Sequence, residues 1–411
     1  MSFLYNLGIA LYPLMIRAAA PFNMKAAKWV RGRRGWRRIV AQAFNGTEKV
    51  AWFHAASLGE FEQGRPVMER FREAYPSCRI LLTFFSPSGY EQKKDYDGAD
   101  IVMYLPPDCP SNARYFVEMT KPSLAVFIKY EFWYNYLYEL NRQGVPVVFI
   151  SALFRADQPF FRWYGSWFRK RLNRIDHFFV QDEDSALMLG SIGIERTTVS
   201  GDTRFDRVAD ILSKKTDNKN IEAYCSGNKV LLAGSTWPPD EDILATVIRK
   251  FPDLKLIIAP HEVKEERIKQ LIETLGTGAA RYTTDEPGVW FDKQVLVIDT
   301  IGILSGIYRY ADIAYIGGAF STGLHNIQEP AVNGMPVIFG PRYHKFREAV
   351  ELVREGGAFS IAGKEELHNV IALLLEDEVK YREACAVSER YMLEQRGATE
   401  KIMKGLRPYV S

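Results

Sequence analysis

A short stretch in the C-terminal half concentrates polar side chains between two apolar runs. The first run ends at Gly317-Gly318 and the second is Pro336 to Gly340. Between them lie Ser321, Thr322, His325, Asn326, Gln328 and Glu329. Loop glycines let backbone amides approach a phosphate, and a following helix would favour the anion through its dipole. Glu329, about one turn into that helix, would bind a ribose diol. The pattern predicts a nucleotide-sugar site; the alternative is a βαβ unit whose glycines only make turns.

Further donor-side candidates follow other predicted strands. Ser235 and Thr236 end an apolar run, where hydroxyl groups and backbone amides suit a phosphate. His261 follows the next run and is a candidate nucleotide contact, although a loop histidine more often has no specific role. Arg204 could meet the negative charge of a donor, or form a salt bridge that packs two domains together.

Two acids near the N-terminus could do acid–base chemistry. Glu60 stands at the head of a helix that follows the apolar run Val50 to His54. There the helix dipole keeps a carboxylate ionised, as a general base requires, but Glu60 could also be only a helix-end charge. Glu131 follows a second apolar run and either orients an acceptor or pairs with Lys129. We assign Ser57, Lys129 and Glu131 to the acceptor side.

Other chemistries find little support in the sequence. Acid-x-acid triplets occur at 95–97, 182–184 and 240–242, but in charge runs or at helix starts, so we expect no metal. The sequence has no GxGxxG after a strand and no GxxxxGK[ST], which excludes the usual dinucleotide and P-loop signatures. Four scattered cysteines indicate neither a zinc site nor a disulfide framework.

The elements that must position these residues are short apolar runs alternating with helical patterns, which is typical of parallel sheets. The predicted strands of the first series are Val50–His54, Arg79–Phe84, Ile101–Leu105, Leu124–Lys129, Val145–Ser151 and His177–Gln181. Those of the second are Lys229–Gly234, Leu254–Ala259, Gln294–Ile298, Asp312–Gly317 and Pro336–Gly340.

These two series predict an α/β protein with two doubly wound, Rossmann-like domains facing a central cleft. The expected parts are an N-terminal segment, 1–22, an acceptor-binding domain, 23–210, a polar linker, 211–228, and a donor-binding domain, 229–411. The last helix of the chain could pack back on the first domain. Ligands are expected at the carboxyl ends of the strands.

The N-terminal segment combines an apolar stretch with strong positive charge. Phe3 to Ile16 is apolar but shorter than the ~20 residues needed to span a bilayer. Nine Lys or Arg and one acid lie within residues 1–49, whereas the whole chain carries a net charge of only +3. We therefore expect a shallow anchor on an anionic membrane. A signal peptide is the first alternative, but its charges would precede the apolar stretch. A nucleic-acid surface is the second.

Taken together, the motifs resemble the 3-deoxy-D-manno-octulosonic acid (Kdo) transferase family. They are HAASLGE at 54–60, KYEFW at 129–133, GDTRFD at 201–206, GSTW at 234–237 and the long run 299–341. The resemblance implies a GT-B fold, a CMP-Kdo donor, a lipid A precursor as acceptor, no catalytic metal or other cofactor, inversion at the anomeric carbon, and the cytoplasmic face of a Gram-negative inner membrane.

By this likeness Glu60 matches the catalytic base and Glu131 an acid of the acceptor-side motif. The donor-side matches are Ser235, Thr236, Gly317, Gly318, Asn326 and Glu329. Two rival functions remain open. One is a GT-B glycosyltransferase or an epimerase that uses another nucleotide sugar, and the other is a membrane-bound carbohydrate-recognition protein without catalysis.

Overall fold

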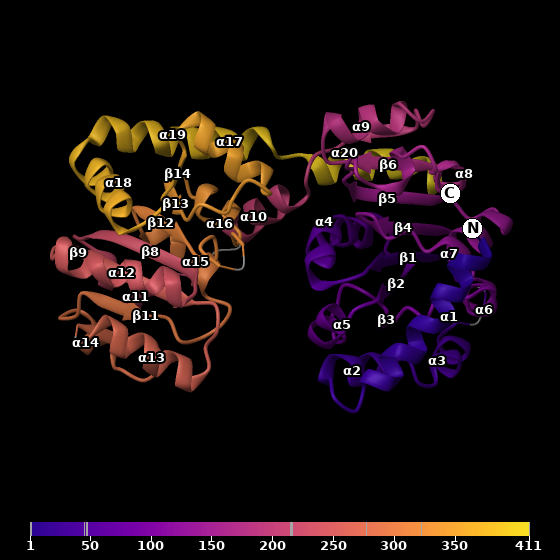
Figure 1. Ribbon diagram of the computed structural model, residues 1–411, viewed down its shortest axis with the longest axis horizontal. Coiled ribbons are helices and arrows are strands. Elements are labelled where there is room, and N and C mark those ends of the chain that lie inside the picture. The colour runs from indigo at the N-terminus through magenta and orange to yellow at the C-terminus, as the bar shows by residue number, and fades with distance from the viewer. Residues whose placement is uncertain are drawn as a thin grey trace. The chain divides into compact units, whose positions relative to one another are not determined.

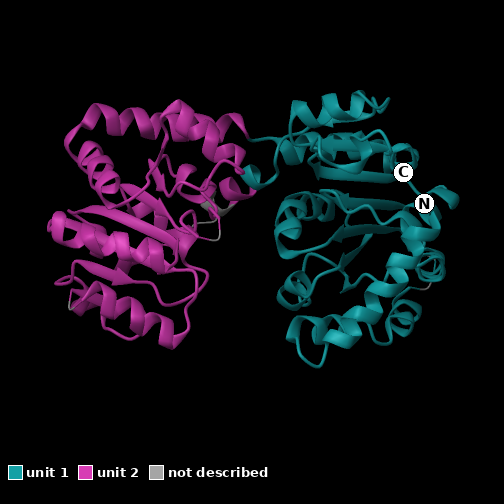
Figure 2. Ribbon diagram, viewed as in Figure 1, with its two compact units in different colours: residues 1–206, 396–411 teal, residues 207–395 magenta. Residues whose placement is uncertain are grey.

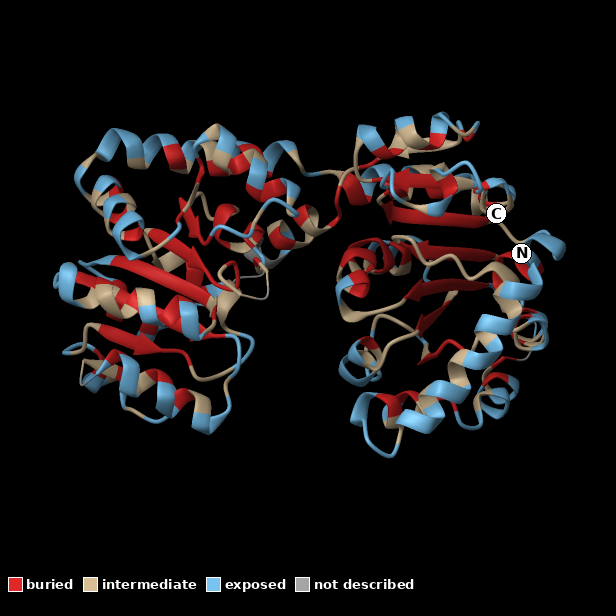
Figure 3. Cartoon of the chain, in the orientation of Figure 1, coloured by how far each residue is buried: buried red, intermediate tan, exposed pale blue. Residues whose placement is uncertain are grey.

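The computed structural model describes residues 2–44, 46, 48–213, 217–276, 278–321 and 323–410. The chain divides into two compact units (Figure 2). Unit 1 comprises residues 1–206 and 396–411, and unit 2 comprises residues 207–395. Each unit is built around its own parallel sheet, whose strands are almost entirely buried (Figure 3).

The sheet of unit 1 has the strand order β3-β2-β1-β4-β5-β6-β7 and is parallel throughout. Its strands are β1 (Val50–Ala55), β2 (Arg79–Phe84), β3 (Ile101–Tyr104), β4 (Leu124–Ile128), β5 (Val147–Ala152), β6 (His177–Val180) and β7 (Thr197–Val199). The order reverses direction between β1 and β4, which are neighbours in the sheet. This is the switch point at which doubly wound sheets bind their ligands.

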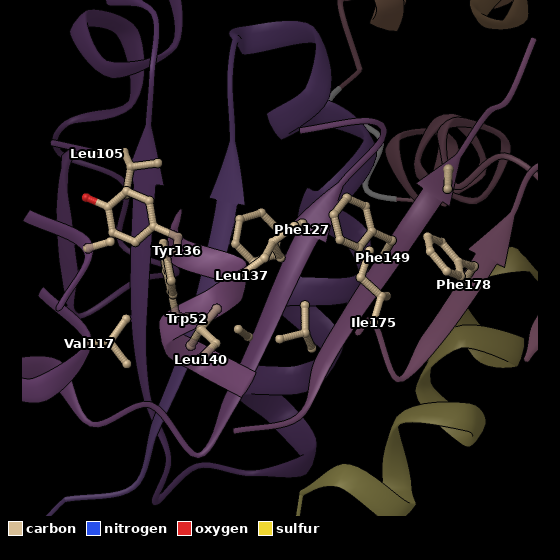
Figure 4. Close-up of a cluster of buried hydrophobic side chains, with 14 of the residues drawn as sticks. Trp52, Leu105, Val117, Phe127, Tyr136, Leu137, Leu140, Phe149, Ile175 and Phe178 are labelled. Atoms are coloured by element: carbon tan, nitrogen blue, oxygen red, sulfur yellow. The ribbon is translucent and has the colours of Figure 1, made fainter. Parts of the chain in front are cut away.

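Helices cover both faces of this sheet (Figure 1). They are α1 (Ser2–Ala19), α2 (Met24–Gly32), α3 (Trp36–Ala43), α4 (Leu58–Ala74), α5 (Pro87–Lys93), α6 (Pro110–Thr120), α7 (Tyr134–Arg142), α8 (Ser166–Leu172), α9 (Glu183–Gly190) and α20 (Ala398–Leu406). Alternate residues of β1 enter opposite cores: Trp52 joins one cluster, shown in Figure 4, and Phe53 joins the other. Burial on both faces explains why the strands read as continuous apolar runs.

The sheet of unit 2 has the order β10-β11-β9-β8-β12-β13-β14 and is also parallel. Its strands are β8 (Lys229–Thr236), β9 (Leu254–Pro260), β10 (Ala279–Arg281), β11 (Val295–Val297), β12 (Ile313–Ile316), β13 (Val337–Phe339) and β14 (Ala358–Ser360). Its longer helices are α12 (Pro238–Lys250), α13 (Glu265–Leu275), α17 (Arg347–Glu355), α18 (Lys364–Glu376) and α19 (Glu378–Glu394), and the shorter ones α14 (Pro287–Trp290), α15 (Leu304–Ile307) and α16 (Gln328–Ala331). The switch point lies between β8 and β12.

The predicted fold class of two doubly wound parallel sheets is confirmed. All eleven predicted strands are present within two residues at each end. The sequence reading missed β7, β10 and β14, which are three-residue strands at the edges of the two sheets and are less completely buried, so they leave almost no apolar run.

The segment predicted as a linker, 211–228, differs from that expectation where it is described. Helix α10 (Arg204–Ser213) spans the unit boundary after Asp206, and α11 (Lys219–Cys225) belongs to unit 2. Ile221 and Tyr224 of α11 are buried, so this polar segment carries an apolar helix face. The chain returns to unit 1 at Arg396, and α20 packs against α4.

Helix α1 lies on unit 1 with an outward apolar stripe. Tyr5 donates a hydrogen bond to Asp108 at 2.5 Å, Asn6 accepts one from Asn135 at 2.9 Å, and Tyr12 packs edge-on against Trp29. The opposite side exposes Phe3, Leu4, Leu7, Leu11, Leu14 and Met15 at helical spacing. Within the described residues, none of the helices has the length and apolar character needed to cross a bilayer.

Candidate functional site

The switch point of unit 1 brings the predicted acids together. Glu60 is the third residue of α4, directly after β1, and only 8% of it is exposed. Its Oε2 accepts hydrogen bonds from the backbone N–H of Ser57 at 2.8 Å and from the Ser57 hydroxyl at 3.1 Å. This capping interaction holds the carboxylate in place. Both bonds use Oε2, so within the described residues Oε1 has no hydrogen-bond partner and can serve a substrate.

Glu131 follows β4, the strand adjacent to β1. Burial, and then the negative charge of Glu60, raise the pKa of Glu131 to about 8, although the Trp133 indole N–H partly offsets this increase. Glu131 is therefore mainly protonated at neutral pH. The site thus places Glu60, held by Ser57 at the start of α4, beside a second acid that is mainly neutral, an arrangement that suits general base catalysis by Glu60.

Lys129, the other predicted acceptor-side residue, shapes the turn after β4. It has a positive φ of 65°, and its ammonium lies 5.7 Å from the centre of the Tyr130 ring. The left-handed backbone at Lys129 redirects the chain so that the next residues turn over the sheet edge. In this structure Glu131 interacts with Glu60, His54 and Trp133, whereas the alternative sequence interpretation paired Glu131 with Lys129.

His54 and Trp133 support the acids, and the sequence reading gave them no role. The Trp133 indole donates to His54 Nε2 at 2.9 Å, so this nitrogen carries no proton, and Nδ1–H faces the carbonyl and hydroxyl of Thr83 at 3.1 and 2.8 Å. Burial lowers the pKa of His54 to about 3, which keeps the ring neutral. The signal was present in the sequence as a histidine inside an otherwise apolar strand.

In unit 2 the predicted donor residues gather at the ends of β8 and β12. Buried Asp240 joins the two loops: its Oδ2 accepts from the backbone N–H groups of Trp237 and Gly318, both at 2.9 Å, and its Oδ1 accepts from Tyr315 at 2.8 Å. Gly318 has a φ of 95°. At Gly317 a Cβ atom would lie 2.5 Å from the Ser235 carbonyl oxygen. These glycines therefore let the two loops come into close contact.

The hydroxyl residues of this edge have different surroundings. Ser235 has a left-handed φ of 53° at the end of β8. The Thr236 hydroxyl is buried and donates to Glu241 at 2.9 Å, so it is already engaged, contrary to a simple phosphate contact. The Ser321 hydroxyl is buried without a partner in the described structure. Thr322 lies outside the described residues.

An aromatic stack stands at the same end of the sheet. His261 stacks on Trp237 at 4.8 Å and on His325 at 4.5 Å between ring centres. The Trp237 indole donates to His325 Nε2 at 3.0 Å, and burial followed by the proximity of His261 lowers the pKa of His325 to about 4. The stack therefore presents flat, uncharged ring surfaces on the His325 side, which suits contact with a planar base.

Asn326 and Glu329 are adjacent, but the expected helix is shorter than the pattern suggested. Asn326 donates to Glu329 Oε1 at 3.2 Å, and burial raises the pKa of Glu329. Helix α16 spans only Gln328–Ala331, so the predicted helix-dipole contribution to anion binding is not supported. The helix begins only at Gln328 and ends at Ala331, and Gly334, three residues later, has a left-handed φ of 69° that prevents its continuation.

Arg204 lies in unit 1 and forms an ion pair with Asp202. Its Nε is 2.8 Å from Asp202 Oδ2, and a terminal nitrogen of the guanidinium is 2.6 Å from the same oxygen. Both partners lie in unit 1, so this pair is not the salt bridge between domains that was the alternative, and a contact of Arg204 with the donor stays a prediction. Among the described residues, no group of three His, Cys, Asp or Glu side chains could hold a metal ion. Metal independence stays a prediction.

Comparison with known proteins shows which family the chain resembles. A family model described as 3-deoxy-D-manno-octulosonic-acid transferase (kdotransferase) matches residues 31–207. The chain is a relative of the Kdo transferases. The transferase of Chlamydophila psittaci is 26% identical over 89% of this chain and 86% of its own length, and that of Haemophilus influenzae is 26% identical over 87% of each chain. The resemblance and the enzyme class, a glycosyltransferase, are confirmed.

Solved structures confirm the fold. The UDP-GlcNAc 2-epimerase of Neisseria meningitidis, solved with UDP-GlcNAc, has a TM-score of 0.62 at 18% identity and covers 88% of this chain and all of its own. A UDP-N-acetylglucosamine 2-epimerase from Listeria monocytogenes, described as putative, has a TM-score of 0.61 at 12% identity over 88% of this chain and 96% of its own. These likenesses establish that this chain has a GT-B-like fold.

Proposed function

We propose that this protein transfers Kdo from CMP-Kdo to a hydroxyl group of a lipid A precursor, with inversion and without a metal ion. The observation that carries the proposal is the pair of acids at the switch point of unit 1, where hydrogen bonds from Ser57 hold the Glu60 side chain in position and Glu131 is kept mainly neutral. The names of the sequence relatives support Kdo as the sugar.

In this mechanism Glu60 Oε1 takes the proton from the acceptor hydroxyl as its oxygen attacks the anomeric carbon of Kdo. The bond between that carbon and the CMP oxygen breaks, and CMP leaves with the electron pair. Neutral Glu131 can donate a hydrogen bond to an acceptor oxygen, and its protonation avoids a second negative charge beside Glu60. The direct displacement yields inversion.

Unit 2 is assigned to the donor in this proposal. Backbone amides of the loops after β8 and β12, near Ser235 and Gly318, would bind the phosphate and stabilise the charge that grows on it. The Trp237–His261–His325 rings would contact the cytosine base, and Glu329 with Asn326 would bind the ribose hydroxyls. A shared GT-B-like fold does not distinguish transfer from epimerisation, so the donor must be tested directly.

We also propose that helix α1 lies in the cytoplasmic surface of the inner membrane. Its outward stripe of six exposed apolar side chains, and Phe22 at 92% exposure beyond its end, would bury in lipid, while the basic residues of α2 and α3 face anionic headgroups. This placement would bring a membrane-held acceptor to unit 1.

The test measures CMP release by detergent-solubilised protein given CMP-Kdo and a tetraacylated lipid A precursor, with EDTA throughout. We expect release that depends on the lipid and survives EDTA. Glu60→Gln should reduce the rate at least 10²-fold, the usual contribution of a general base, while CMP binding is unchanged. Release from UDP-sugars instead would reassign the donor, and an active Glu60→Gln variant would remove Glu60 from the role of base.

A further inference from the structure

Residues of helices α1, α2 and α3 and of the segments beside them in unit 1 line a cavity of about 870 Å³. Its charged lining residues are five arginines: Arg17, Arg31, Arg33, Arg34 and Arg37. In the part of the chain that the structure describes, no Asp or Glu lines it. Such a cavity concentrates positive potential and selects for an anion.

Arg33 is buried at the inner wall, and no described Asp or Glu pairs with it. Among the described residues its guanidinium donates to backbone carbonyl oxygens alone, those of Leu105, Trp29 and Phe85, at 2.9, 3.2 and 2.7 Å. Three aromatic rings surround it, the nearest being Trp29 with its centre at 3.9 Å. Burial lowers the pKa of Arg33 to about 9, which still leaves it charged at neutral pH. An anion in the cavity would offset this uncompensated charge.

Trp29 supplies a second, independent sign of a missing acceptor. Trp29 lines the cavity and is 95% buried, yet its indole Nε1–H has no hydrogen-bond partner in the described structure. An indole can only donate, and a buried donor left unpaired costs about 1–3 kcal/mol. A ligand that accepts hydrogen bonds would remove this cost.

The other arginines of the cavity are available for a ligand. Arg17, Arg31, Arg34 and Arg37 are exposed, and no carboxylate among the described residues lies within salt-bridge distance of them. The single acid within residues 1–49, Glu48, pairs with Arg79 instead. Guanidinium groups bind phosphate oxygens through paired hydrogen bonds, which makes them the preferred side chains for this anion.

We infer that the cavity between α1, α2 and α3 is a binding site for the phosphate group of a membrane lipid. The five arginines and the Trp29 indole all donate hydrogen bonds or carry positive charge, and phosphate esters supply the complementary acceptors and charge. A lipid is the source because α1 contributes Pro13 and Arg17 to the wall and exposes its apolar stripe on another side. The inference rests on the membrane contact proposed above.

The experiment measures binding of the full-length protein to phosphatidylcholine vesicles that contain 20% phosphatidate or 20% cholesteryl hemisuccinate, which carries a carboxylate in place of a phosphate. Arg31→Gln/Arg34→Gln removes two exposed charges from the cavity. The matched control, Lys25→Gln/Arg38→Gln, removes two exposed charges of α2 and α3 that do not line the cavity. Trp29→Phe removes the unpaired N–H without a change of charge, and thermal unfolding confirms that each variant is folded.

A diffuse basic surface predicts the same loss of affinity for both pairs, roughly 30-fold at low salt. A phosphate site predicts that Arg31→Gln/Arg34→Gln reduces the affinity for phosphatidate vesicles at least ten times more than the control pair does. On cholesteryl hemisuccinate vesicles the two pairs should lose similar affinity. Trp29→Phe should weaken binding to phosphatidate vesicles only. Equal losses for the two pairs on phosphatidate would overturn the inference.

Two further measurements separate the sources of failure. Inorganic phosphate should compete with phosphatidate vesicles only at millimolar or higher concentrations; if it competes at micromolar concentration, the ligand is free phosphate and the lipid assignment is wrong. Partition onto pure phosphatidylcholine, which depends on the apolar stripe, reports on the membrane contact alone. If Leu7→Asp/Leu11→Asp does not reduce that partition, the membrane part of the proposed function fails.

Discussion

Replacing Glu131 with glutamine removes a titrating carboxyl group from the site and keeps the side chain's shape. Burial and the charge of Glu60 raise the pKa of Glu131 to about 8 in the folded protein, whereas an unfolded glutamate has a pKa of about 4.3. The folded state thus holds this proton more tightly. The free energy of unfolding therefore falls as the pH rises from about 4.3 to about 8, and the Glu131→Gln substitution would abolish that fall.

The magnitude follows from the two pKa values. Each tenfold difference in proton affinity corresponds to ~1.4 kcal/mol, so the wild type loses up to ~5 kcal/mol by about pH 9. Even ~2 kcal/mol would move the melting temperature by about 4–8 °C in a unit of this size. Between pH 5.5 and 8.5, the melting temperature of Glu131→Gln should rise relative to that of the wild type by at least this amount.

Calorimetric unfolding at pH 5.5, 7.0 and 8.5 measures this difference, with Glu195→Gln as the control for loss of an exposed carboxylate in unit 1. Glu60→Gln should reduce the wild-type pH dependence without abolishing it, because the charge of Glu60 is the second cause of the raised pKa and burial is the first. Parallel pH profiles for the wild type and Glu131→Gln would refute the assignment of a neutral Glu131.

Two other substitutions test the supporting structure. Gly318→Ala should destabilise unit 2 by about 1–3 kcal/mol and weaken CMP binding, both measured by calorimetry. The reason is that Gly318 has a φ of 95° and that a Cβ atom there would lie 2.3 Å from the Gly323 carbonyl oxygen. An equal effect of Gly306→Ala, where a Cβ atom would meet nothing within 4 Å, would contradict this reason. Tyr5→Phe removes the hydrogen bond to Asp108 and should weaken the packing of α1 on unit 1 by about 1–3 kcal/mol. Trypsin should then remove the helix faster. Unchanged proteolysis would mean that the aromatic contacts are sufficient to hold α1 in place.

The sequence was sufficient for the architecture because its determinants are local. A strand buried on both faces must be apolar along its length, so β1 with Trp52 and Phe53 stands out without any knowledge of its neighbours. The alternation of such runs with helical patterns then requires parallel sheets. The same reasoning placed Glu60 and Glu131 after strands, and the resemblance to Kdo transferases was carried by contiguous motifs that survive as sequence.

Only the tertiary structure decided what each of these residues can do. The protonation of Glu131 depends on burial and on Glu60, 71 positions away in the sequence, and the neutral tautomer of His54 depends on Trp133 and Thr83. Spacing predicted neither, because a pKa is set by the groups that surround an atom in space. The arginines near the N-terminus likewise read as a charged surface, and the packing of three helices brings them, with an unpaired indole, around one cavity.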